Sequence, residues 1–153
     1  MITVRTFVLC LVLVFVGALA VTAQSNDTID IILSQDPATV GSSAYLALSA
    51  AGLVADEATP REAFTAAVDL GWLDPEMSAG DTATFGIAAH LLMQAFEEKG
   101  GLMYRIFTGP RYAAREFEYR QWVPDRHSPG EPITGEFLIR MAGSFLEKRE
   151  VTP

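Results

Sequence analysis

Residues 110–146 read PRYAAREFEYRQWVPDRHSPGEPITGEFLIRMAGSFL. A proline before an apolar-periodic run predicts a helix start, and the proline- and glycine-containing stretch that follows predicts a loop. In the second periodic run, Phe137, Leu138, Met141 and Phe145 recur at helical spacing behind a threonine that can cap the helix. The stretch therefore predicts a helix–loop–helix unit.

A second copy of this unit lies fifty residues earlier, at 60–96, with the sequence PREAFTAAVDLGWLDPEMSAGDTATFGIAAHLLMQAF. An ungapped alignment matches residues that open, close or cap helices. The matched pairs include Pro60/Pro110, Arg61/Arg111, Ala63/Ala113, Trp72/Trp122, Gly80/Gly130 and Thr84/Thr134. We expect the later helix of this copy to begin after Asp81 or Thr82. The equivalent tryptophans favour a shared packing role at a helix end over a ligand clamp.

Residues 28–51 resemble a shortened copy, because two apolar runs flank the helix-breaking pair Asp36 and Pro37. We therefore predict an all-α fold, with two full repeats and one degenerate repeat packed in a single domain spanning 24–153. The connector 102–108, LMYRIFT, is apolar enough to be tucked against this domain, and a short strand is possible there.

The first 23 residues have the pattern of a cleaved signal peptide. Arg5 supplies the positive charge, residues 7–16 are continuously apolar, and Ala20 and Ala23 fit the positions that a signal peptidase reads. The apolar run is short for a spanning helix, which needs about 20 residues. We expect export to the periplasm or cell surface, with membrane attachment only if this segment stays uncleaved.

Charge is unevenly distributed along the chain. Residues 24–100 hold 12 acidic and 2 basic residues, a net of −10, whereas residues 101–153 hold 7 acidic and 8 basic residues, a net of +1. This balance argues against generic nucleic-acid binding and predicts two unlike faces or ends. The single cysteine, Cys10, lies in the signal segment. Disulfides and thiolate sites are thereby excluded from the predicted mature chain.

The candidate binding surface is a basic and aromatic cluster within residues 104–127. Arg111, Arg115 and Tyr119 follow one another at four-residue spacing and so share one helix face. Arginine suits carboxylate or phosphate ligands, and arginine and aromatic residues dominate interaction hot spots. The predicted surface comprises Arg111, Arg115, Tyr119, Trp122 and Arg126. The alternative is a solvated face in which the arginines pair with Glu116 and Glu118, and Glu116 is also spaced for a pair with Arg120.

Catalytic and metal chemistry have weak support in the sequence. His90 and His127 lack the short spacing to carboxylates that a metal site needs, so we expect no metal and no cofactor. His90 reads as a helix-flank histidine with a local hydrogen bond, and His127 as a loop residue without a named partner. Ser42 and Ser43 lack a nucleophile-elbow motif and are better explained as helix caps.

The helix–loop–helix unit resembles the S-layer homology family, whose modules usually come as three copies. The family's second helix opens with an Ile-Thr-Arg-Ala-Glu type motif. The best match is residues 133–137, ITGEF, and residues 81–85, DTATF, match less well. In the family, the motif's Arg holds an anionic cell-wall polysaccharide, and here Gly135 stands at that position. The resemblance implies an all-helical envelope module.

We therefore expect a non-enzymatic, exported envelope module that is structural or binds a partner. An anionic cell-wall polymer, an acidic envelope protein and self-association through the acidic half of a second copy would each fit the basic cluster. A protein–protein adaptor of a periplasmic assembly is the alternative function, and a small periplasmic hydrolase is a weaker one.

Overall fold

The computed structural model describes residues 27–55 and 57–151, so the predicted signal peptide lies outside the described residues. A helix over 27–33 is followed by six further helices. They are α2 (Val40–Ala50), α3 (Pro60–Asp69), α4 (Phe85–Ala95), α5 (Leu102–Ile106), α6 (Pro110–Tyr119) and α7 (Gly135–Val151). The described part of the chain contains isolated bridges but no strand, which confirms the all-α prediction.

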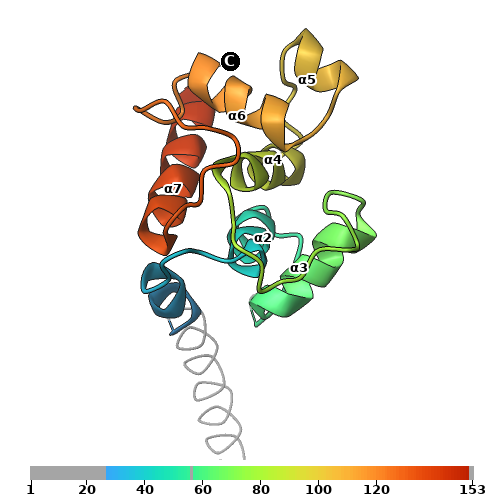
Figure 1. Ribbon diagram of the computed structural model, residues 1–153, viewed down its shortest axis with the longest axis vertical. Helices are drawn as coiled ribbons and strands as arrows, with labels where there is room; N and C mark the ends of the chain where they lie inside the picture. The colour runs from blue at the N-terminus through green and yellow to red at the C-terminus, as the bar shows by residue number, and fades with distance from the viewer. Residues whose placement is uncertain (1–26, 56, 152–153) are drawn as a thin grey trace, which may run out of the picture.

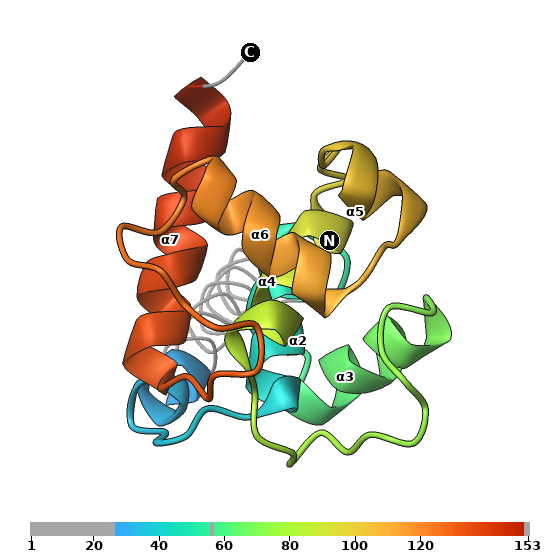
Figure 2. The same ribbon diagram turned by 45° about the horizontal axis from the view of Figure 1, so that its top comes forward.

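The helices pack around one core. In Figure 1, α4 lies near the middle, with α2 below it, α6 above it, α7 along one side and α3 on the other. Figure 2 keeps the same neighbours and shows α6 crossing close to α4. The centre of the core is aromatic: Phe117 stacks on Phe145 with ring centroids 5.4 Å apart, and Phe85 meets Phe117 edge-on at 6.2 Å. One compact domain results, as expected.

Besides Thr59 at the start of α3, three threonines cap helix starts in the same way. The Oγ1 atoms of Thr39, Thr84 and Thr134 accept hydrogen bonds from the backbone N–H groups three residues later, at 3.1, 3.4 and 3.2 Å. The prediction that the helix after residue 80 begins behind Asp81 or Thr82 is therefore wrong. Residues 82–84 run alongside neighbouring segments, and the helix starts only at Phe85.

The segments that enter these three helices meet one another in a closed ring of backbone hydrogen bonds. Ala83 donates its N–H to the carbonyl of Ala38 at 2.9 Å, Ile133 donates to Ala83 at 3.2 Å, and Ala38 donates to Ile133 at 2.8 Å. Each residue directly precedes one of the capping threonines, and all three are buried. The ring joins residues far apart in the sequence, so it fixes how α2, α4 and α7 enter the core.

Glycine allows the chain to approach itself closely beside this ring. A Cβ on Gly86 would lie 2.8 Å from the carbonyl oxygen of Pro129 and 2.9 Å from that of Pro110. A Cβ on Gly135 would collide with the carbonyl of Ile32. Gly86 donates its backbone N–H to the carbonyl of Pro129, and Gly135 donates to the carbonyl of Gln35, both at 2.9 Å. Side chains at these positions would force the segments apart.

The connector between α4 and α6 differs from the prediction. Residues 102–106 form the short helix α5 instead of a strand, and the apolar side chains of this segment are exposed instead of tucked against the domain. Only Tyr104 of this segment is buried. The prediction failed because hydropathy alone does not tell which face of so short a helix meets the core.

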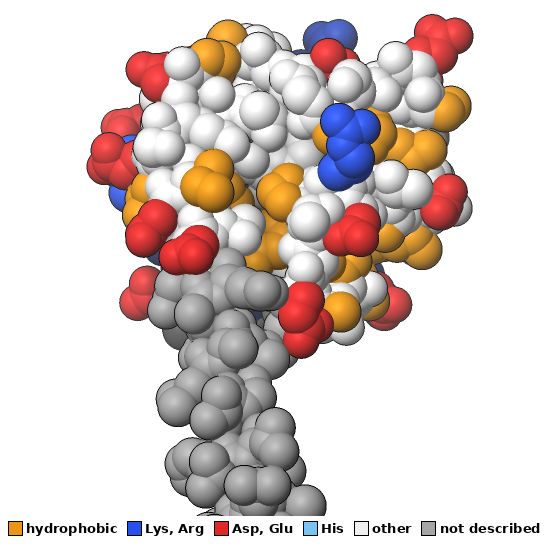
Figure 3. Space-filling view, turned by 90° about the horizontal axis from the view of Figure 1, so that it is seen from below, with side chains coloured by type: hydrophobic (Ala, Val, Ile, Leu, Met, Phe, Trp, Pro, Cys, Tyr) orange, Lys and Arg blue, Asp and Glu red, His pale blue; other side chains and the backbone are white. Residues whose placement is uncertain are grey.

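Acidic side chains are numerous at the end of the molecule near the 27–33 helix. Figure 3 views this end, where acidic side chains are spread around the rim, with apolar side chains and a basic side chain among them. At the other end, α6 presents Arg111 and Arg115, both exposed.

Candidate functional site

The basic face of α6 is created by the way that this helix buries its other side. Pro110 starts the helix, and Ala113, Ala114 and Phe117 are buried against the core. The residues at 111, 115 and 119 therefore point outward, and Tyr119 is the most exposed of the large apolar side chains, at 86%. Arg111, Arg115 and Tyr119 share this outer face.

Arg111 and Arg115 line a pocket of about 380 Å³ between α6 and the loop that leads to α7. The remaining lining residues are Ala114, Glu118, His127 and Pro129. Two arginines and one glutamate line the pocket, so the arginines outnumber the acidic residue there. Such a lining suits an anionic group, which arginine binds through charge-assisted hydrogen bonds.

The two arginines are free of internal ion pairs. Neither Arg111 nor Arg115 forms an ion pair with any other residue that the structure describes, and Arg115 lies over the ring of Tyr112 at 5.7 Å. The carboxylate of Glu118 instead accepts the backbone N–H of His127 at 3.2 Å. Of the pairs that the alternative proposed, the described residues therefore show the one between Arg120 and Glu116 and none that involves Arg111 or Arg115.

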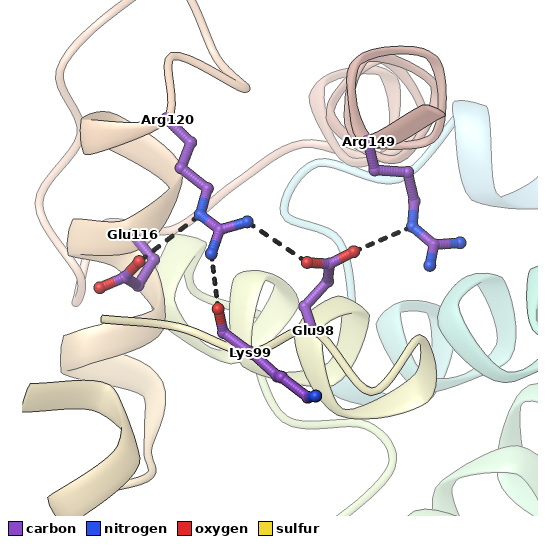
Figure 4. Close-up of polar contacts among 5 residues, drawn as sticks. All are labelled: Glu98, Lys99, Glu116, Arg120 and Arg149. Carbon is purple, nitrogen blue, oxygen red and sulfur yellow. Dashed lines mark hydrogen bonds and ion pairs between the residues drawn. The ribbon is translucent and has the colours of Figure 1, made fainter. Parts of the chain in front are cut away.

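Arg120 takes the carboxylate that the neighbouring arginines lack, and Figure 4 shows its contacts. It lies 3.7 Å from Glu116, as the four-residue spacing predicted, and 3.3 Å from Glu98, which follows the end of α4. Arg149 of α7 holds the other oxygen of Glu98 at 3.1 Å. The network joins the ends of α4 and α6 to α7. Arg120 and Arg149 therefore stabilise the packing of these helices through ion pairs, whereas Arg111 and Arg115 form none with the described residues.

His127 belongs to the pocket, which the sequence reading missed. Its ring packs against Phe85 and Phe137, with centroids 5.1 and 4.7 Å away, and its Nδ1 lies 3.4 Å from a carboxylate oxygen of Glu131. Its Nε2 is buried and has no hydrogen-bond partner among the described residues. His127 lies in a loop, as expected, and Glu131 is the partner that the sequence analysis did not name. A loop histidine four residues before a glutamate was the signal available in the sequence.

Arg126 lies in a different groove from Arg111 and Arg115. This groove, of about 700 Å³, runs between the end of α6 and α7, and it contains three cationic and three acidic side chains. They are Arg120, Arg126, Lys148, Glu118, Asp125 and Glu147. Because its cationic and acidic side chains are equal in number, this groove suits an anionic ligand less well than the smaller pocket does. Glu118 lines both and separates them.

Trp122 cannot take part in a surface contact, contrary to the sequence-based expectation. Its side chain is 2% exposed and packs edge-on against Phe117 and Phe145 at 4.9 and 4.8 Å. The hydroxyl of Ser144 donates to the backbone carbonyl of Trp122 at 2.6 Å. The side chain belongs to the core because α7 covers it, which agrees with a packing role at a helix end.

The other residues considered for catalysis are buried in structural roles. His90 is hydrogen-bonded to the backbone of Trp72 and lies 3.4 Å from the hydroxyl of Tyr104, so its partners are distant in sequence instead of local. Burial lowers the pKa of His90. Ser42, also buried, donates its hydroxyl to Gln35 at 2.8 Å. Within residues 27–55 and 57–151, no three potential metal ligands come together.

Compared with known proteins, the chain matches no protein-family model, no curated protein and no solved structure. In the described part of the chain, no helix has the length and apolar character needed to cross a bilayer.

Proposed function

We propose that this chain is a non-enzymatic envelope module built from three S-layer-homology-like units. The support for three units is the ring of hydrogen bonds among Ala38, Ala83 and Ile133, in which each unit contributes the same position before its capping threonine. The two fuller units also share a hydrogen bond in the loop between their helices. Ser78 and Ser128 each donate a backbone N–H to the acidic side chain three residues later, at 2.8 and 3.1 Å.

The family's usual ligand contact has no equivalent in this chain. The resemblance implies an arginine directly after each capping threonine, and the residues found there are Val40, Phe85 and Gly135, all of them buried. Polysaccharide binding through that position therefore has no cation to use. A module of this kind needs another surface for its partner.

That surface is the pocket of Arg111 and Arg115, and the observation that carries the proposal is their lack of internal ion pairs among described residues. Two exposed, uncompensated guanidinium groups beside a concave surface suit a carboxylate- or phosphate-bearing partner. An anionic cell-wall polymer and an acidic envelope protein both have this chemistry. Export, inferred from Arg5 and the apolar run at 7–16, would bring the module to either.

Co-sedimentation of the exported protein with purified, protein-free cell wall tests the proposal. Binding that weakens as salt is raised supports an anionic wall polymer as the partner, because salt screens exposed charges. Absence of wall binding, together with salt-sensitive capture of an envelope protein, supports the adaptor function. Absence of both kinds of binding would contradict a binding module.

A small hydrolase is the second candidate, and a specific observation favours it. His127, Glu118 and Glu131 lie together beside the arginine pocket. A general base needs an accessible nitrogen, however, and Nε2 is buried while Nδ1 faces Glu131. Hydrolysis of a phosphate or carboxylate ester that disappears in His127→Ala would replace the binding proposal with this one.

A further inference from the structure

Helix α5 turns its apolar side chains outward. Four apolar residues of this segment are each more than half exposed, whereas Tyr104 is only 5% exposed. The four are Leu102, Met103, Ile106 and Phe107. Burial of leucine, isoleucine and phenylalanine normally stabilises a fold, so four such residues on one short segment mark an interaction surface. We call these four residues the α5 tip.

The α5 tip is held in place by polar contacts of Tyr104 and by an aromatic contact of Phe107. The hydroxyl of Tyr104 accepts a hydrogen bond from Nε2 of Gln94 at 3.0 Å and lies 3.4 Å from Nδ1 of His90. Phe107 stacks on Tyr112 of α6 with centroids 5.7 Å apart. These contacts fix which way α5 faces, and the exposed apolar residues are a consequence of that orientation.

The stretch of sequence that contains the α5 tip carries cations and no acidic residue. Between Lys99 and Arg115 every charged residue is a cation, while Glu97 and Glu98 precede this stretch and Glu116 follows it. Lys99, Arg105, Arg111 and Arg115 are all exposed, and none forms an ion pair with another described residue. An apolar tip with cations around it is the pattern of segments that lie in the interface of an anionic membrane.

We propose that the α5 tip inserts into the headgroup layer of a bilayer that contains anionic phospholipid. Figures 1 and 2 show α5 standing out from the body of the domain at the end away from the 27–33 helix, so the tip protrudes. A lipid surface yields to a protruding apolar tip, whereas a protein partner would need a matching groove. The acidic end in Figure 3 lies away from the tip and would not be repelled by such a surface. The inference goes beyond the arginine pocket, with which it shares Arg111 and Arg115, because it rests on the apolar residues of the α5 tip.

Vesicle co-sedimentation tests this inference. The full chain is expressed with its own leader, and the exported form is mixed with phosphatidylcholine vesicles with or without phosphatidylglycerol. We expect binding to the anionic vesicles, about fivefold weaker binding for Arg105→Gln, and at least about tenfold weaker binding for Leu102→Ser/Ile106→Ser. The control is Leu53→Ser/Leu70→Ser, which changes two leucines of similar exposure outside α5 and should bind normally. Equal binding of both double variants would overturn the inference.

A site-specific probe makes the result independent of the N-terminal segment. In a Cys10→Ser background, Ile106→Cys and Leu70→Cys are each labelled with an environment-sensitive fluorophore. Anionic vesicles should shift the emission of the probe at residue 106 to the blue and leave that at residue 70 unchanged. An unshifted probe at residue 106 would overturn the inference, as would α5 variants that lose capture of an envelope protein while vesicles are never bound. Wall binding that persists in the α5 variants would show that the pocket acts separately.

Discussion

Ala83 donates its backbone N–H to the carbonyl of Ala38 at 2.9 Å, although 45 residues separate them in the sequence. Together with the equivalent bonds of Ile133, this contact joins three threonine-capped helix starts at the centre of the fold. Close packing of these segments depends on the small residues beside them.

Gly86→Ala should therefore be destabilising by about 1–3 kcal/mol, because its Cβ would press on two backbone carbonyl oxygens that cannot rotate away. Gly143→Ala is the matched control, since a Cβ there meets open space on α7. It should stabilise the protein by about 0.5–1 kcal/mol through helix propensity. Urea unfolding followed by circular dichroism measures both. Equal effects of the two changes would contradict the close approach.

The two tryptophans should differ in their contribution to stability. Trp122→Ala removes a side chain that is 2% exposed and packed among aromatic rings, so a loss of about 3–5 kcal/mol is expected. Trp72 is only partly buried, and Trp72→Ala should cost clearly less. The free energies of unfolding of the two variants test this order, and a larger loss for Trp72→Ala would show that the packing is misassigned.

His90 should make stability fall as the pH is lowered. Burial lowers the pKa of the folded histidine, so the unfolded chain takes up the proton first. The loss begins as the pH falls through about 6.5, the ordinary value for the unfolded chain, and continues down to the lowered folded pKa. His90→Gln removes this group and should flatten the dependence of the unfolding free energy on pH between pH 7.5 and 5.5. If His90→Gln left the pH dependence of the unfolding free energy unchanged, burial would not be lowering the pKa of His90 in the folded protein.

Local sequence signals predicted the starts of α3 and α6 correctly. Thr59 and Pro60 start α3 with a reciprocal cap involving Glu62, and Pro110 starts α6, as the patterns indicated. The ends of α3 and α6 are also alike: Trp72 and Trp122 each donate a backbone N–H five residues back, at 2.9 and 3.0 Å. These signals act over a few residues, and sequence shows them directly.

The parts that the sequence could not supply depend on distant contacts. Trp72 and Trp122 occupy equivalent positions along the chain, but only Trp122 is covered by Phe145 of α7. Arg126 was predicted to share a surface with Arg115, but it lies in another groove because the loop after Trp122 turns toward α7. His127 joined the pocket through aromatic neighbours from α4 and α7. Spacing along one helix carries no information on any of these contacts.

The binding of Arg111→Ala/Arg115→Ala to purified envelope material tests the central claim most directly. The control is Arg140→Ala, which removes an exposed arginine that is already paired with Glu136 at 3.4 Å. Loss of two charge-assisted contacts should weaken the binding of the pocket variant by about tenfold or more, whereas the control should bind like the unchanged protein. Envelope binding that is equal in all three proteins would contradict the claim that this pocket holds the partner.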